Sequence, residues 1–131
     1  MLTDSEPLQW QNDYMAWCQK RINLPHWNVT LKINDKLLVE RETTASVDIH
    51  SNMYYAVIYV RSDTQNDIEG RERIAHEMYH ILMVGFDDIN RAMMNCISDA
   101  TAEPLKYLYE CAQEQLVTML ARSLAREGFD G

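Results

Sequence analysis

The chain has 131 residues, of which 47% are hydrophobic and 24% charged, and its formal net charge is −8. These values are typical of one globular domain and argue against an intrinsically disordered chain. The acidic charge, with no cluster of Lys and Arg, argues against nucleic acid as a partner. No apolar run is long enough to span a bilayer, so no membrane partner is expected. We therefore expect residues 1–131 to form a single domain.

Two features of the sequence bear on its compartment. Asp4 and Glu6 precede any hydrophobic stretch, whereas a secretory signal begins with positive charge. Three cysteines, Cys18, Cys96 and Cys111, have no paired spacing and fit reduced thiols better than a disulfide framework. Both features predict a cytoplasmic protein.

The N-terminal third predicts a helix followed by a strand. Ser5 or Glu6 before Pro7 favours a helix start, because proline suits the first helical position. Leu24-Pro25 should end this helix. Residues 27–33 then alternate apolar and polar side chains, which is the pattern of a half-buried strand.

Further strands are predicted before the middle of the chain. Asn34-Asp35 indicates a turn, and residues 37–40 are assigned to a second strand. Residues 46–50 and 54–60 are two more strands, the latter rich in β-branched and aromatic residues. Because the turns between them are too short for crossovers, we expect a largely antiparallel sheet.

The second half of the chain has helical periodicity. Asn66 with Glu69 three residues later resembles a capping arrangement, and Gly85 is a plausible C-terminal stop. A short helix is predicted near residues 89–97, and Pro104 should open a last helix that closes near Gly128. The expected fold class is α+β, with an N-terminal helix, a small mostly antiparallel sheet and two C-terminal helices.

The strongest chemical signal is His76-Glu77-Met78-Tyr79-His80 within the predicted third helix. Residues four apart on a helix are offset by about 40° and about 6 Å, so both imidazoles can reach one metal ion. This H-E-x-x-H pattern predicts a Zn²⁺ site with His76 and His80 as ligands.

Glu77 lies beside the same site without being a ligand. Its carboxylate can accept a proton from a metal-bound water that attacks a peptide carbonyl, and can return it to the leaving amine. Glu77 is therefore the predicted general base. A purely structural zinc site would need no such group.

A catalytic zinc usually has a third protein ligand. His26 and His50 precede the motif, and no histidine follows it. The third ligand must then be a carboxylate or a thiolate. Glu110 and Glu114, one turn apart on the last helix, are the main candidates from spacing alone, and Cys111 points away from that pair.

His76-Glu77-x-x-His80, followed about thirty residues later by Glu114 and by Leu120-Ala121, resembles the gluzincin pattern of small phage and bacterial zinc metallopeptidases of the ImmA/IrrE type. The resemblance covers roughly residues 27–124. It implies a minimal zincin-like fold, peptide hydrolysis, and Glu114 as the third ligand, because a glutamate in that family precedes an aromatic or aliphatic residue plus alanine.

The sequence departs from this pattern at Thr118, where the family often carries Asp or Asn that supports a histidine ligand. Candidates for stabilising an oxyanion are His50, Tyr54, Tyr55 and Tyr107, although each is more often a packing or surface residue. Met93-Met94 could imitate the methionine turn of other zinc peptidases, but the third histidine of that class is absent.

The sequence thus favours a cytoplasmic zinc endopeptidase acting on a protein or peptide substrate. The alternative is a non-catalytic zinc-binding regulatory or partner-binding protein, phage-related, that retains the zincin fold. An extended peptide is expected to bind beside the sheet edge nearest the metal, because edge strands align such peptides through main-chain hydrogen bonds. The sequence leaves the oligomeric state open.

Overall fold

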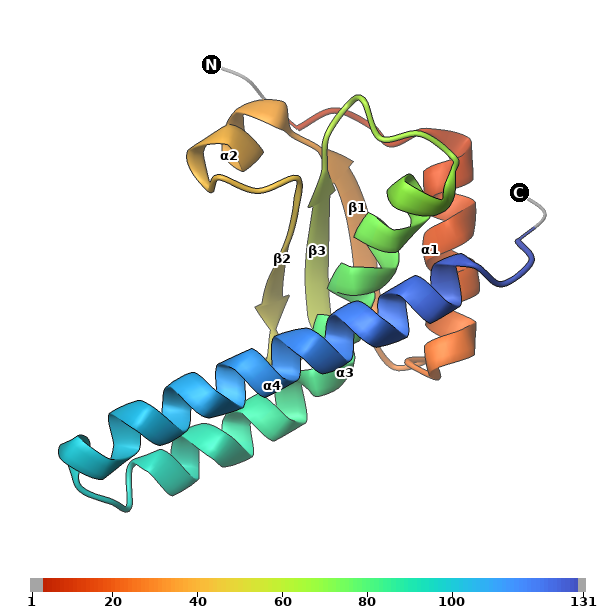
Figure 1. Ribbon diagram of the computed structural model, residues 1–131. Helices are drawn as coiled ribbons and strands as arrows, with labels where there is room; N and C mark the ends of the chain where they lie inside the picture. The colour runs from red at the N-terminus through yellow and green to blue at the C-terminus, as the bar shows by residue number, and fades with distance from the viewer. Residues whose placement is uncertain (1–3, 130–131) are drawn as a thin grey trace.

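The computed structural model describes residues 4–129 (Figure 1). The α+β fold class predicted from the sequence is confirmed. The elements in chain order are α1 (Gln9–Ile22), β1 (Asn28–Ile33), α2 (Asp35–Glu40), β2 (Ala45–His50), the 3₁₀ turn η1 (Ser51–Met53), β3 (Tyr55–Val60), α3 (Ile68–Met94) and α4 (Asp99–Ala125).

The three strands form one mixed sheet in the order β1-β3-β2. β3 is central: Ile58 pairs with Leu31 of the parallel strand β1 and with Val47 of the antiparallel strand β2. The sequence predicted a mostly antiparallel sheet. That prediction is wrong for the pairing of β1 with β3, which is parallel, and correct for the pairing of β2 with β3. It assumed that strands adjacent in the chain pair directly, whereas the long connection from β1 to β3, which includes α2 and β2, permits a parallel pairing.

The segment predicted as a second strand, residues 37–40, is part of helix α2 instead. Asn34 caps this helix, because its side-chain oxygen accepts a hydrogen bond from the Leu37 N–H at 3.0 Å. Asn34 followed by Asp35 was therefore the start of a helix and not a hairpin turn. The prediction was wrong because a run of only three apolar residues, Leu37 to Val39, fits either element.

Helix α1 begins later than Pro7. The main-chain N–H of Leu8 donates to Gln11 Oε1 at 2.9 Å, and the first helical residue is Gln9. At the other end Asn23 adopts a left-handed conformation with φ of 64°, which ends the helix just before Leu24 as expected.

Helix α3 is longer than predicted. Its N-cap is Asp67, whose Oδ1 accepts from Gly70 N–H at 2.8 Å, rather than Asn66. Gly85 does not end it, and the predicted separate helix near residues 89–97 is its continuation to Met94. One interior glycine costs only about 1 kcal/mol, which the packing of α4 along α3 can offset.

Helix α4 also begins earlier than predicted. It starts at Asp99, so Pro104 lies within its first turns, and it ends at Ala125 rather than near Gly128. Pro104, the sixth residue of the helix, lacks the N–H that would bond to the Ala100 carbonyl, so α4 continues past one missing main-chain hydrogen bond.

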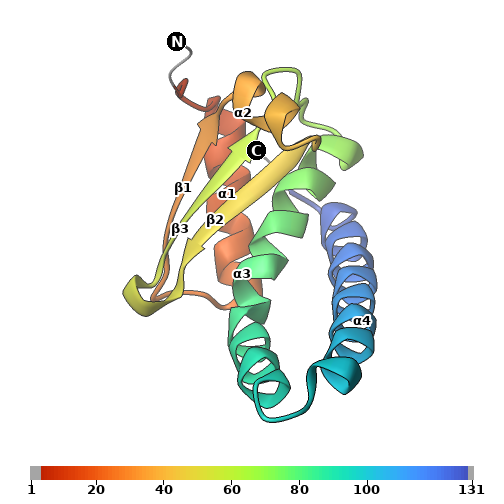
Figure 2. The ribbon, with the colours of Figure 1, turned by 90° about the vertical axis from the view of Figure 1, so that its left-hand side faces the viewer.

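α1 and α3 cover one face of the sheet, and α4 packs on the outer side of α3 (Figures 1 and 2). The core lies between these layers, with Tyr14 and Cys18 from α1, Ile58 from β3, and Ile74 and Met78 from α3 all fully buried. The far halves of α3 and α4 extend past the sheet as an antiparallel hairpin. We call the part formed by residues 82–116 the projecting hairpin.

Gly70 fixes where α3 begins. A Cβ atom at this position would lie 1.8 Å from the carbonyl oxygen of Gln65, so the loop before the helix packs directly on the glycine backbone. Together with the cap by Asp67, this contact sets the start of the helix that carries the H-E-x-x-H pattern.

Within residues 4–129, no helix is both long enough and apolar enough to cross a membrane. The three cysteines are free, with Cys18 buried in the core, Cys96 exposed and Cys111 partly exposed.

Candidate metal centre

His76 and His80 lie one turn apart on α3, on the side facing α4, and both side chains are partly exposed. Their Nε2 atoms are 3.2 Å apart. The opposite side of the same turns carries Ile74 and Met78 into the core. Burial of that side fixes the rotation of α3 about its axis, and hence the direction of the two imidazoles.

Helix α4 brings Glu114 to both histidines. Glu114 Oε1 lies 2.7 Å from His76 Nε2, and Oε2 lies 3.3 Å from His80 Nε2. The potential ligand atoms of these three residues lie within 4.8 Å of one another. The arrangement depends on the antiparallel packing of α4 along α3, which is the most extensive contact between elements.

This donor set fits zinc. Two imidazole nitrogens and one carboxylate oxygen are a known catalytic set, and zinc–ligand bonds are about 2.0–2.2 Å long. In a tetrahedral site such bonds place neighbouring donors roughly 3.3–3.5 Å apart. The two imidazole nitrogens, 3.2 Å apart, are close to that spacing, and Glu114 approaches them with one oxygen each, Oε1 at 2.7 Å from His76 and Oε2 at 3.3 Å from His80.

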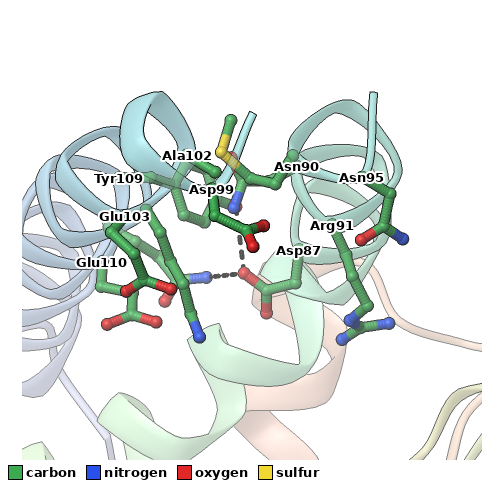
Figure 3. Close-up of a pocket in the computed structure, with 12 residues that line it drawn as sticks. Asp87, Asn90, Arg91, Asn95, Asp99, Ala102, Glu103, Tyr109 and Glu110 are labelled. Carbon is green, nitrogen blue, oxygen red and sulfur yellow. Dashed lines mark hydrogen bonds between the residues drawn. The ribbon is translucent and has the colours of Figure 1, made fainter. Parts of the chain in front are cut away.

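Glu110, the alternative third ligand, lies elsewhere. It lines a cavity of about 520 Å³ between α3 and α4 in the projecting hairpin, together with Glu103 and Asp87 (Figure 3). Glu110 and Glu103 are absent from the donor cluster formed by His76, His80 and Glu114. Among the described residues, Glu114 is therefore the carboxylate that meets both histidines.

Glu77 is buried, with only 8% of its surface exposed. Burial, and then the nearby negative charge of Glu114, raise the pKa of Glu77 to about 8. No ion pair of Glu77 with a basic side chain is found in the described residues, so nothing offsets its desolvation. A carboxyl group with a raised pKa beside a candidate metal site is a common property of catalytic acids and bases.

The pKa of His80 is lowered, mainly because burial disfavours the imidazolium, while the charge of Glu114 acts in the opposite direction. A lowered pKa keeps the imidazole neutral near pH 7. The neutral ring is the form that binds a metal ion.

Two clefts meet at Glu77, between α3 and strand β2. One, of about 390 Å³, is lined by Ala45, His76 and Glu77; the other, of about 420 Å³, is lined by Val47, Glu77 and His80 among others. Among the described residues β2 pairs only with β3, so its outer edge is unpaired and borders both clefts. The sheet edge nearest the candidate metal site is therefore the outer edge of β2.

Sequence reasoning missed Asp87. It lies near enough to His80 to influence its pKa, and it lines the same cleft. Its carboxylate accepts hydrogen bonds from Tyr109 at 3.0 Å and from Gln113, which anchors α4 to α3 next to the site. The spacing in the sequence could have identified this residue. Asp87 follows His80 by seven residues, or two helical turns, and therefore lies on the same side of α3.

Other sequence candidates lie away from the clefts at Glu77. His50 stacks on Tyr55, and Tyr54 packs edge-on against Trp27. Tyr107 is exposed on the projecting hairpin. None of these lines either cleft.

Three more candidates lie outside the donor cluster. Thr118 and Cys111 share a shallow groove with Glu114 along α4. Met94, from the suggested methionine turn, lines the cavity that holds Glu110 rather than lying beneath the histidines. The structure therefore places none of the three among the donors that could hold a metal ion.

Comparison of the chain with protein-family models, with curated proteins and with solved structures finds no match.

Proposed function

We propose that the protein is a zinc-dependent peptidase in which His76, His80 and Glu114 hold the ion and Glu77 is the general base. The observation that carries this proposal is the meeting of two imidazoles and a carboxylate beside a buried glutamate, at clefts bordered by an unpaired strand edge. A structural zinc site is normally closed by four protein ligands, whereas three ligands beside a cleft leave one position open.

The reaction assigns distinct tasks to these residues. Zinc bound here would polarise the substrate carbonyl and lower the pKa of a water molecule. Glu77 accepts the proton that this water loses on attacking the carbonyl carbon, and then donates it to the leaving nitrogen as the C–N bond breaks. Glu77 must be a carboxylate for the first step, a form that its burial opposes and a neighbouring dication favours.

The substrate in this proposal is an extended protein or peptide segment. The outer edge of β2 offers main-chain N–H and C=O groups beside Glu77, and an extended peptide can pair with such an edge. Side chains of Ala45, Val47 and Ile49 on β2 would lie near the bound segment. We place this activity in the cytoplasm, because the three cysteines have no paired spacing and are free in the structure.

Metal analysis together with Glu77→Gln tests the proposal. We expect one zinc per purified chain, lost in His80→Ala. Glu77→Gln should keep zinc and fold while peptide hydrolysis falls by roughly 10²–10⁴-fold, because only proton transfer is removed. Cleavage of a quenched-fluorescence peptide mixture is the readout, and Glu110→Gln on α4 is the matched control that should retain activity.

The outcomes separate the two hypotheses. A protein that takes up no zinc would contradict the whole proposal. A chain that binds zinc tightly but cleaves no peptide would instead support the non-catalytic zinc-binding alternative. Loss of zinc in Glu77→Gln would mean that Glu77 is a ligand and not the base.

A further inference from the structure

An apolar stripe on α3 is exposed beyond the sheet. Leu82, Phe86, Ile89 and Met93 recur at intervals of four, three and four residues, so they share one side of the helix. Each is between 38% and 60% exposed. The same side of α3, nearer its N-terminus, carries Ala75 into the core, where α1 covers it. From Leu82 onward nothing in residues 4–129 buries this side.

Helix α4 carries a matching stripe of Leu105, Leu108, Leu116 and Met119, each between 39% and 62% exposed. Ala112, also exposed, occupies the middle position of this stripe. The hydrogen bonds from Tyr109 and Gln113 to Asp87 fix the alignment of the two helices. With that alignment the two stripes run side by side in opposite directions, and Ala112 lies level with Phe86.

Both stripes lie on one side of the hairpin. At 100° per residue, each stripe is rotated roughly 100° from the line of residues that faces the other helix, in the same sense on both helices. Because the helices are antiparallel, the same sense of rotation puts both stripes on the same side. We call these eight large side chains, with Ala112, the apolar face.

The apolar face carries no charge within the projecting hairpin. Its last residue, Met119, lies just beyond the hairpin and shares a groove with Arg122 and Arg126. The charged residues of the two segments fall toward the neighbouring helix or on the opposite side, where Asp87, Arg91, Lys106 and Glu110 line the cavity of Figure 3 and Glu114 meets the histidines. Asp88 also lies there and pairs with Arg91 at 3.1 Å. The candidate metal centre and the apolar face therefore occupy opposite sides of the hairpin.

We propose that the apolar face is the interface of a homodimer, in which two projecting hairpins pack into a four-helix bundle. A half-exposed large apolar residue presents on the order of 100 Å², so the eight together offer about 800 Å² per copy, the area that each partner buries in a standard interface. That area also exceeds the apolar patches of ordinary monomers, which are about 300–600 Å².

Two properties of the face favour a second copy over another partner. Every chain has a net charge of −8, so two copies repel each other, and contact through a face with few charges adds least to that repulsion. An isologous pair of helical hairpins also buries both stripes of each copy at once. Small Ala112 beside large Phe86 provides room for a side chain from the opposing copy. The metal centres remain open on the outer sides of the bundle.

Mass measurement by light scattering during size exclusion tests the dimer. The full-length protein at tens of micromolar should have twice the chain mass of 15.3 kDa. Ile89→Glu should weaken association at least about 100-fold and give single chains, because a charge at the centre of the interface loses its water without gaining a partner. Leu108→Glu on the other helix should do the same, and provides a second variant if one misfolds.

Met53→Glu is the matched control, because Met53 is 72% exposed but lies on η1, outside the hairpin. It should remain a dimer, and circular dichroism should show all three variants folded. A single-chain mass for the unaltered protein, or an unchanged dimer in both hairpin variants, would overturn the proposal. Monomers that co-sediment with neutral phosphatidylcholine vesicles would overturn it in favour of a lipid surface.

Discussion

The two halves of α3 have similar sequence patterns and different surroundings. In the first half, apolar residues such as Ile74 and Met78 pack into the core, and the opposite side presents two imidazoles to α4. In the second half, equally apolar residues such as Phe86 and Ile89 are exposed. The comparison shows that a three-to-four-residue period of apolar residues identifies an amphipathic helix but does not identify what covers its apolar side.

The boundary between the halves also divides the acidic residues of α4. Glu114 contacts both histidines of the first half of α3, whereas Glu110, one turn away on α4, lines the cavity with Asp87 and Arg91 of the second half. Glu77 is buried, while Glu110 is exposed. Three predictions use this boundary.

The largest effect is expected for the third ligand. Glu114→Ala should weaken zinc binding at least about 100-fold, because protein zinc sites bind with about 10 kcal/mol or more, shared among few ligands. Glu110→Ala, one turn along the same helix, should change the affinity less than about 3-fold. Competition with a chromogenic chelator measures both. Equal losses in the two variants would remove the distinction between the halves.

Proton binding by Glu77 should make metal-free protein less stable as the pH rises. With a pKa near 8 in the folded state and an ordinary value in the unfolded state, Glu77 binds more protons when folded. Its contribution is therefore present at lower pH and is lost toward pH 8. The lowered pKa of His80 acts in the opposite direction, because the unfolded ring still binds part of a proton near pH 6.5, but above that pH it adds only about 0.4 kcal/mol.

Urea unfolding of chelator-treated protein measures this loss. Between about pH 6.5 and 8 we expect the free energy of unfolding to fall by roughly 1–2 kcal/mol. Glu77→Gln should abolish this slope, and Glu110→Gln, in the projecting hairpin, should retain it. A slope that persists unchanged in Glu77→Gln would assign the titration to another group.

The smallest effect concerns Gly85, near the boundary itself. It has ordinary helical geometry, and a Cβ atom there would meet nothing within 4 Å. Gly85→Ala should therefore raise the free energy of unfolding by about 0.5–1 kcal/mol, by restricting the unfolded chain and favouring the helix. Gly70→Ala is the contrasting control and should destabilise. A destabilised Gly85→Ala would show that the helix needs flexibility where its surroundings change.

The sequence predicted the parts of the fold that depend on local pattern. Alternation located β1 and β2, the β-branched and aromatic composition located β3, and the three-to-four-residue period located the core side of α3. The capping role of Asn34 was missed, because Asn-Asp also begins turns. The parallel pairing of β1 with β3 was missed, because strand order depends on tertiary packing and not on the residues of one strand.

The candidate site was predictable for a different reason. His76, Glu77 and His80 follow from helical spacing, which is a local property. Periodicity left Glu110 and Glu114 equivalent, because one turn along α4 preserves the direction of the side chain. The register of α4 on α3 separates them, and Asp87 contributes to that register through contacts with α4 that no single-helix pattern contains.

The close approach at Gly70 has a consequence for recognising related chains. Only glycine fits against the Gln65 carbonyl, and the six positions from there to His76 are consecutive helical residues, so the distance between them cannot vary without rotating the histidines. Asp67 is tied to the same glycine by its capping hydrogen bond. The combined signature Asp-x-x-Gly-x₅-His-Glu-x-x-His is thus far more selective than the five-residue zinc motif alone. It would identify distant proteins that share this helix entry as well as its chemistry.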